Sequence, residues 1–251
     1  MQCVILAGGL GTRMRGVTRD EIPKALIPVA SSLGTEPFAF YQLKWLASCG
    51  VTNVVYSIGF LGEQIRAVVG NGSRWGLTIK YVDEGKELRG TGGALRKAFD
   101  EKVLDERFFV VYGDSFLPIE LLPIWSAFAP MAAPALMTVL KNRNQWDSSN
   151  VIFENNNLRL YKKNATPEEK SLMHYIDYGL SLIRRKTIAT NIEADRKTDL
   201  AAVYEKLSVE GRLLGYEVQE RFYEIGSEQG LRDFEHWLKK QENIQWLSRL
   251  N

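Results

Sequence analysis

The first half of the chain alternates short apolar runs with longer segments whose apolar residues recur at helical spacing. The apolar runs predict buried strands, at residues 2–6, 53–58, 77–82 and 107–112. The helically spaced segments predict helices, at residues 38–49, 62–69 and 94–99. Gly50 follows the first of these helices as a C-cap. Strands that alternate with helices in this way favour parallel pairing with right-handed crossovers.

The second half of the chain mixes strands and helices less regularly. Strands are predicted at residues 134–140, 150–154, 158–161, 175–184 and 214–218, and helices at residues 199–208 and 229–241. Asn155, Asn156 and Asn157 form the turn of a predicted hairpin. No internal repeat or linker-like segment interrupts the pattern. We therefore expect one Rossmann-like α/β domain over residues 1–251, with a mixed, mainly parallel central sheet.

The composition narrows the class of protein. A hydrophobic content of 45% and a charged content of 25% are typical of a globular protein and exclude a disordered, fibrous or membrane class. The 32 basic and 30 acidic residues leave a net charge of +2, so charge gives no reason to expect a nucleic-acid partner. Neither cysteine, Cys3 or Cys49, lies in a metal-type spacing, which favours reduced core residues. Without a basic leader or a stretch of about 18 apolar residues, we expect a cytoplasmic protein with no membrane partner.

The strand at residues 2–6 stops at three glycines within four positions, which are Gly8, Gly9 and Gly11. Because glycine lacks a Cβ atom, successive N–H groups can converge on an anion without steric cost. Thr12, Arg13 and Lys24 add a hydroxyl and two cations. A tight turn with no chemical role needs one or two glycines but neither cation. The loop therefore indicates a phosphate site.

Two familiar phosphate loops are excluded by their spacing. Residues 9–14 lack the third glycine of the dinucleotide-binding fingerprint, and no Gly-x-x-x-x-Gly-Lys-Ser/Thr motif occurs in the chain. What remains is Gly-Gly-x-Gly-Thr-Arg at residues 8–13, followed by Pro-Lys-Ala-Leu at residues 23–26. This pattern resembles the signature of the sugar-1-phosphate nucleotidyltransferases. The resemblance implies a nucleotide-diphospho-sugar transferase fold, with a nucleotide-binding half at about residues 1–115 and a sugar-binding half at about residues 116–251.

The resemblance assigns the nucleoside triphosphate to two glycine-rich segments. The implied nucleotide-binding residues are Leu6, Ala7, Gly8, Gly9, Gly11, Thr12, Arg13, Gly90, Thr91 and Gly92. Arg13 and Lys24 are the implied catalytic residues, because their charges screen the triphosphate and the departing pyrophosphate. In this family, residues 89–95 lie along the base and ribose, although the same residues also suit a plain helix entry.

A metal site is implied by two carboxylates. Asp114 follows the buried strand at residues 107–112, where such sheets bind ligands, although it could also cap the next turn. The family carries a metal-binding aspartate in a Gly-Asp pair at this point, and Tyr112 here replaces the asparagine often found before it. Residues 222–227 match the family's aromatic-x-Asp-Ile-Gly-Thr stretch, with Glu224 in place of the aspartate. The resemblance thus implies a Mg²⁺ cofactor shared by Asp114 and Glu224.

The sugar 1-phosphate is assigned to the second half of the chain. The implied sugar-phosphate-binding residues are Asn150, Lys162, Lys163, Asp177 and Gly179. The family places a lysine after a strand on the sugar phosphate, and both Lys162 and Lys163 stand in that place. A solvated basic turn is the alternative for the two lysines, and a turn or a surface salt bridge is the alternative for Asp177.

The wider pattern is most similar to the D-glycero-α-D-manno-heptose 1-phosphate guanylyltransferases. It includes residues 146–150, 175–180 and 220–226. This similarity implies GTP and a heptose 1-phosphate as substrates, and a step in surface-polysaccharide biosynthesis. N-acetylmuramate-type uridylyltransferases and mannose-1-phosphate guanylyltransferases are the alternatives, because no residue establishes from sequence alone that guanine is read. A homodimer is left open.

Functions of other classes fit the sequence less well. A non-catalytic nucleotide-sugar-binding regulatory subunit could keep the fold, but it would not need Arg13, Lys24 and Asp114. An NAD-dependent oxidoreductase is disfavoured by the missing third glycine. Catalysis by histidine is disfavoured because the chain has two histidines, His174 and His236, and the second falls within a predicted surface helix.

Overall fold

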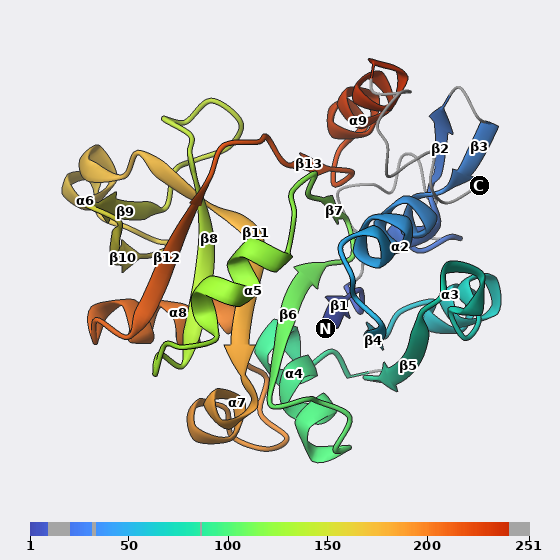
Figure 1. Cartoon of the computed structure of the whole chain (residues 1–251), viewed down its shortest axis with the longest axis horizontal. Helices are drawn as coiled ribbons and strands as arrows, with labels where there is room; N and C mark the ends of the chain where they lie inside the picture. The colour runs from blue at the N-terminus through green and yellow to red at the C-terminus, as the bar shows by residue number, and fades with distance from the viewer. Residues whose placement is uncertain (10–20, 32–33, 86, 241–251) are drawn as a thin grey trace. The chain divides into compact units, whose positions relative to one another are not determined.

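The computed structural model describes residues 1–9, 21–31, 34–85 and 87–240, and its backbone forms two compact units (Figure 1). The first unit contains residues 1–88, 111–118 and 222–251, and the second contains residues 89–110 and 119–221. Each unit therefore combines separate segments of the chain, and the first unit joins residues near both ends of the described chain.

Three parallel strands form the centre of the first unit, in the order β1-β4-β5. They are β1 (Gln2–Leu6), β4 (Asn53–Ile58) and β5 (Thr78–Asp83). In their register, Val4 of β1 lies opposite Val55 of β4, which in turn lies opposite Lys80 of β5. Every residue of β1 is buried, the polar Gln2 together with the apolar run at residues 3–6. The parallel pairing predicted from the alternation of strands and helices is confirmed for these three strands.

Shorter elements surround these strands within the first unit. They are the turns η2 (Lys24–Leu26) and η3 (Ser73–Trp75), the antiparallel pairs β2 (Pro28–Ser31) with β3 (Gly34–Pro37) and β7 (Ser115–Phe116) with β13 (Tyr223–Glu224), and the helices α2 (Phe38–Ser48), α3 (Gly62–Val69) and α9 (Glu228–Lys240). Residues 38–46 of α2 are all buried. The buried Gln42 amide of this helix donates hydrogen bonds to the carbonyls of Tyr112 and Ser115, at 2.9 and 2.7 Å. These bonds hold the backbone on either side of Asp114.

The second unit is built on strands in the order β10-β9-β11-β8-β12. Their bounds are β8 (Ala135–Lys141), β9 (Val151–Glu154), β10 (Asn157–Tyr161), β11 (Tyr175–Arg184) and β12 (Leu213–Val218). Neighbouring strands are antiparallel except for β8 and β12, which are parallel. The helices of this unit are α4 (Gly90–Asp100), α5 (Leu122–Phe128), α6 (Pro167–Leu172), α7 (Arg185–Asn191) and α8 (Leu200–Val209). Strand β6 (Arg107–Tyr112) begins in this unit and ends in the first.

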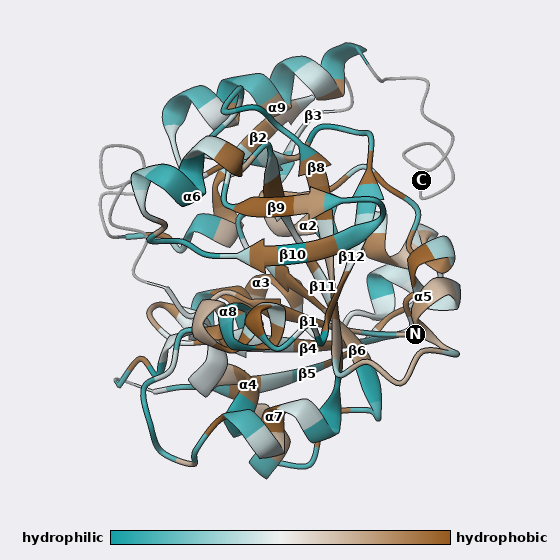
Figure 2. Cartoon of the chain, turned by 90° about the vertical axis from the view of Figure 1, so that its left-hand side faces the viewer, coloured by the Kyte–Doolittle hydropathy of each residue, from teal (hydrophilic) through white to brown (hydrophobic). Residues whose placement is uncertain are grey.

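The fold class predicted from the sequence is confirmed, because parallel and antiparallel strands combine with helices in one mixed α/β architecture. The β9–β10 hairpin turns at Asn155 and Asn156, whose φ angles of 51° and 58° lie in the left-handed region that asparagine tolerates. Figure 2 shows this turn as hydrophilic beside largely hydrophobic strands. Cys3 and Cys49 are free and buried, as predicted.

The sequence patterns misplaced one helix start and missed several short elements. Helix α4 begins at Gly90 and not at residue 94. The amides of Gly92 and Gly93 lie in its first turn and donate hydrogen bonds to the carbonyl of Thr198, a contact that the local sequence pattern does not reveal. The hairpin β2–β3 and the helices α5, α6 and α7 are too short for a periodic signal. Helix α6 carries a signal that could have revealed it, a capping box between Thr166 and Glu169.

The described part of the chain was also searched for membrane-spanning segments. None of its helices has both the length and the apolar character needed to cross a bilayer.

Helix α9 is attached to the first unit through one apolar face. Most of the helix is hydrophilic (Figure 2), but Phe234 and Leu238 are buried. The Phe234 ring lies 5.4 Å from that of Phe38 on α2 and 4.8 Å from that of Phe116 on β7. Its ring centroid is also 6.1 Å from that of Tyr223 on β13. Phe234 therefore supports the strand pair β7–β13 from the side of α9.

We expect Phe234→Ala to lower the free energy of unfolding by about 3–5 kcal/mol, because the truncation leaves a cavity among packed rings. Urea denaturation followed by far-ultraviolet circular dichroism measures this change. His236→Ala, at an exposed position of the same helix, is the matched control and should change stability by less than about 0.5 kcal/mol. Equal denaturation midpoints for the two variants would contradict this account of α9.

Candidate active-site residues

The residues at the carboxyl end of β1 form the first candidate cluster. Of the predicted nucleotide-binding residues, Leu6, Ala7, Gly8 and Gly9 are described, whereas Gly11, Thr12 and Arg13 lie outside the described residues. The amide of Gly113 donates a hydrogen bond of 2.9 Å to the Leu6 carbonyl. A Cβ atom on Gly113 would lie 2.7 Å from the Cβ atom of Ala7, so only glycine permits this approach. The structure thus brings Asp114 next to the start of the glycine loop.

Lys24 and Asp114 form an ion pair in this cluster. The Lys24 Nζ lies 3.0 Å from the Asp114 Oδ2, and both side chains are partly buried, with exposed fractions of 17% and 27%. Lys24 starts the short turn η2 directly after Pro23, whose fixed φ angle directs the chain into that turn. The predicted catalytic lysine and the predicted metal-binding aspartate are therefore in direct contact.

Glu224 reaches the same place through strand pairing. It lies opposite Ser115 in the β7–β13 register, and the amide of Ile225 donates a hydrogen bond of 2.9 Å to the carbonyl of Asp114. The backbones of the two predicted metal ligands are therefore neighbours. Within the described residues, no group of three or more Asp, Glu, His or Cys side chains could hold a metal ion. Carboxylate oxygens are ligands that Mg²⁺ prefers, so the chemistry of Asp114 and Glu224 fits that ion.

Sequence reasoning missed Glu84, a carboxylate in the same cluster. Its side chain is 8% exposed, and its Oε1 accepts a hydrogen bond of 3.3 Å from the Ser57 hydroxyl. The same oxygen occupies the space that a Cβ atom on Gly8 would need. Glu84 follows β5 directly, as Asp114 follows β6 after one residue. A carboxylate just past the carboxyl end of a buried strand was the signal that could have found it.

The second candidate cluster is in the other unit and begins at the first turn of α4. The amides of Gly92 and Gly93 donate hydrogen bonds of 2.9 and 3.2 Å to the carbonyl of Thr198. A Cβ atom on Gly90, whose φ is +72°, would lie 2.7 Å from that same carbonyl oxygen. The close approach of Thr198 therefore accounts for glycine at these positions by packing alone. Thr91, which lies between Gly90 and Gly92, instead bonds the side chain of Asp199.

Asp199 joins Thr91 to one of the two predicted lysines, a role that sequence reasoning missed. Its Oδ1 accepts a hydrogen bond of 3.0 Å from the Thr91 hydroxyl, and its Oδ2 lies 2.9 Å from the Lys163 Nζ. Asp199 is also the N-cap of α8, where it accepts a bond of 3.0 Å from the Ala201 amide. Burial raises the pKa of Asp199, but the Ala201 amide and Lys163 outweigh burial, and the pKa lies below its usual value.

The remaining sugar-site residues gather around Asp177. The amide of Asp177 donates a hydrogen bond of 2.9 Å to the Asn150 side chain, and the amide of Gly179 donates one of 3.0 Å to the Asp177 carboxylate. Burial raises the pKa of Asp177 to about 6, although the Gly179 amide and the charge of Lys163 act in the opposite direction. Lys162 instead pairs with Glu169 at 3.0 Å. Hydrogen bonds thus join Asn150, Asp177 and Gly179, whereas Lys163 pairs with Asp199 and Lys162 with Glu169.

Comparison with known proteins identifies the family. Residues 2–180 match the nucleotidyl transferase family model, and the chain belongs to this family. A D-glycero-alpha-D-manno-heptose 1-phosphate guanylyltransferase of Aneurinibacillus thermoaerophilus is 36% identical over 48% of this chain and 49% of its own. A glucose-1-phosphate thymidylyltransferase of Streptomyces griseus is 36% identical over 47% of this chain and 31% of its own. The matches span half the length of these relatives or less.

A solved structure supports the same fold. A Bacillus anthracis protein described as a glucose-1-phosphate thymidylyltransferase superposes with a TM-score of 0.81 over 95% of both chains, at 19% sequence identity. The predicted nucleotide-diphospho-sugar transferase fold is therefore confirmed.

The pKa of Asp177 predicts how stability depends on pH. A carboxyl group whose pKa is raised on folding contributes stability that is full below about pH 4 and is lost as the pH rises through about 6. Asp177→Asn removes this contribution, so the wild-type protein should lose stability relative to the variant between pH 4 and pH 7. Urea denaturation of both proteins across this range measures the difference. A constant difference would show that Asp177 titrates normally.

Proposed function

We propose that this chain transfers a nucleotidyl group from a nucleoside triphosphate to a sugar 1-phosphate and releases pyrophosphate. The observation that carries the proposal is the Lys24–Asp114 ion pair at the end of β1, with Glu224 held beside it by strand pairing. A cation and two carboxylates next to a glycine-rich loop suit a triphosphate and its metal ion. Membership of the nucleotidyl transferase family supports the same reaction.

The reaction needs charge neutralisation more than proton transfer. A phosphate oxygen of the sugar 1-phosphate attacks the α-phosphorus of the triphosphate, and the bond from that phosphorus to the oxygen bridging the α- and β-phosphates breaks. The attacking oxygen is already deprotonated at neutral pH, so no general base is required. Both substrates are anions, and negative charge accumulates on the departing pyrophosphate. Lys24 is placed to neutralise part of that charge as it develops.

We propose that Asp114 and Glu224 hold Mg²⁺. The ion, when bound, supplies positive charge to the phosphate oxygens of the triphosphate. The Lys24 ammonium lies 3.0 Å from the Asp114 Oδ2. Asp114 would therefore hold the ion beside Lys24, and the ammonium would bind a phosphate oxygen of the triphosphate.

In the second unit, we propose that Lys163 binds the sugar phosphate. Lys163 is coupled to Asp177 by its charge and to Asp199 by an ion pair, and both side chains of that pair are about half exposed. A sugar phosphate could therefore reach the ammonium group. Lys162 is paired with Glu169, an acidic residue of the α6 capping box. Asp177 and Asn150, beside Lys163, offer oxygen acceptors for sugar hydroxyls.

We propose GTP and D-glycero-α-D-manno-heptose 1-phosphate as the substrates. The resemblance in residues 146–150, 175–180 and 220–226 favours this pair. Two relatives that are equally similar to this chain, at 36% identity, are named for different nucleotides and sugars. Sequence identity alone therefore does not select the substrates.

The test is a panel of GTP, UTP, dTTP, CTP and ATP crossed with heptose, mannose, glucose and N-acetylmuramate 1-phosphates, with pyrophosphate release as the readout. The proposal expects the highest kcat/KM for GTP with the heptose 1-phosphate. Nucleotide binding without pyrophosphate release from any pair would instead indicate a non-catalytic subunit.

Lys24→Ala should lower kcat by about a hundredfold, because the lost charge acts on the transition state. Steady-state turnover at saturating substrates measures this effect. Lys80→Ala, which removes an exposed lysine from β5 of the same unit, is the matched control and should retain wild-type turnover. Near-normal turnover of Lys24→Ala would remove this residue from the mechanism.

Asp114→Asn should raise the Mg²⁺ concentration needed for half-maximal activity and lower activity sharply, with Glu224→Gln similar or milder. Glutamate is one methylene longer than the aspartate usual in the family, so a bond through water would soften the effect of Glu224. Mg²⁺ titrations of the initial rate measure both variants. Glu63→Gln, at an exposed site on α3, is the control. Titrations of both variants that overlay the wild-type curve would make these carboxylates structural.

Lys163→Ala should raise the KM for the sugar 1-phosphate by about tenfold or more while leaving the KM for GTP unchanged, because a charged hydrogen bond to phosphate is lost. Lys162→Ala is an internal control with the same change of charge one residue away. Initial rates at varied sugar 1-phosphate separate the two variants. A larger effect of Lys162→Ala than of Lys163→Ala would assign the binding of the sugar phosphate to Lys162.

A further inference from the structure

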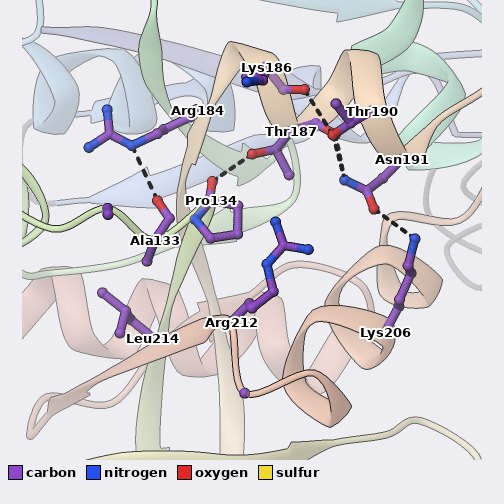
Figure 3. Close-up of a pocket in the computed structure, with 12 residues that line it drawn as sticks. Ala133, Pro134, Arg184, Lys186, Thr187, Thr190, Asn191, Lys206, Arg212 and Leu214 are labelled. Carbon is purple, nitrogen blue, oxygen red and sulfur yellow. Dashed lines mark hydrogen bonds between the residues drawn. The ribbon is translucent and has the colours of Figure 1, made fainter.

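A pocket in the second unit combines basic side chains with an apolar wall. Its volume is about 540 Å³, and it lies where β11 ends and β8 and β12 begin (Figure 3). Four of its twelve lining residues are cationic: Arg184, Lys186, Lys206 and Arg212. None of the twelve is Asp or Glu. The net charge of the whole chain is only +2, yet four cationic side chains line this one pocket.

The lysines keep more of their charge available than the arginines. The Lys206 Nζ donates a hydrogen bond of 3.1 Å to the Asn191 side chain, which is neutral. Lys186 adds a second ammonium group from α7. Arg212 is paired with Glu210 at 2.8 Å, and Arg184 lies 3.6 Å from Glu106. Carboxylates thus compensate two of the four cations, and the two lysines leave the pocket lining with a net positive charge.

Several of these groups are held in place before any ligand arrives. The Arg184 guanidinium donates to the carbonyls of Ala133 and Met131, at 3.2 and 2.6 Å. Asn191 is itself fixed by the carbonyl of Thr187, at 3.0 Å. Figure 3 shows Lys206 reaching Asn191 and the Arg212 guanidinium directed into the space between Pro134 and Asn191. A site that is ordered in advance loses less conformational entropy on binding.

We propose that this pocket binds a small phosphorylated metabolite. Lysine and arginine side chains recognise phosphate groups by charge and hydrogen bonding. The volume exceeds that of a single phosphate and falls within the range of small-molecule sites, so the ligand has an organic part. Ala132, Ala133, Pro134 and Leu214 supply an apolar wall for that part.

The pocket is separate from the residues proposed to bind the sugar phosphate. Asp177 lies near the beginning of β11 and Arg184 at its end. Seven residues of extended strand span about 20 Å. This inference therefore does not rest on the proposed function, and either can fail without the other.

The experiment titrates the ¹⁵N-labelled full chain with pyrophosphate, fructose 1,6-bisphosphate or ADP at constant ionic strength. Amide shifts of Thr187, Lys206 and Leu214 report the pocket, and those of Gly8 and Asp114 report the first candidate cluster. The proposal expects at least one probe to give saturable shifts at the three pocket amides, while fructose gives none. If no probe moves these amides at millimolar concentration, the proposal is wrong.

Charge-reversal variants test whether the basic residues bind the probe. Lys206→Glu and Arg212→Glu should each weaken binding at the pocket by about tenfold or more, because a charged contact to phosphate is replaced by repulsion. Lys239→Glu makes the same change of charge at an exposed position of α9 and should leave the affinity unchanged. Both pocket residues are exposed, so their variants should keep the wild-type amide spectrum elsewhere. Equal affinities in all three variants would overturn the proposal.

Discussion

The pairing of two very short strands, β7 and β13, is the constraint on which the first candidate cluster depends. The bond from the Ile225 amide to the Asp114 carbonyl joins a segment near the end of the described chain to the end of β6. Two residues on each side supply few backbone hydrogen bonds, and so short a ladder is not stable alone. The Phe234 ring packs against Phe116 and Tyr223 and supplies the missing stabilisation from α9. Carboxylates from distant parts of the sequence are therefore positioned by apolar packing.

Charge compensation stabilises this cluster. A partly buried carboxylate without a partner is costly, and Lys24 removes that cost for Asp114. The chemistry that we propose uses the same residue, because the Lys24 charge would neutralise part of the charge on the triphosphate. Gly113 allows this geometry by letting β6 end against Ala7. The packing at Gly113, the charge pairing of Lys24 with Asp114 and the proposed catalysis therefore all require the same local geometry.

In the second unit, Asp199 has a comparable role. One carboxylate caps α8, receives the Thr91 hydroxyl and pairs with Lys163, so it joins two helices and a lysine. Glycines at the start of α4 let the Thr198 carbonyl approach closely and complete this junction. The basic pocket lies at the other end of β11, where α7 and the end of α8 supply its lysines. The unit thus presents two different sets of cations.

The long elements could be predicted from the sequence alone, and so could the chemical class of the site that we propose. Buried strands such as β4 and β6 carry enough local apolar pattern to be predicted residue by residue, and glycines with Lys24 and Asp114 indicated a phosphate and metal site. The tertiary structure was needed to show which charges meet. That Lys163 pairs with Asp199 and Lys162 with Glu169, and that Glu84 lies against Gly8, depends on contacts that form only when the chain folds. Such contacts leave no periodic signal, because hydrophobic patterning specifies which face is buried but not which polar side chains end up side by side.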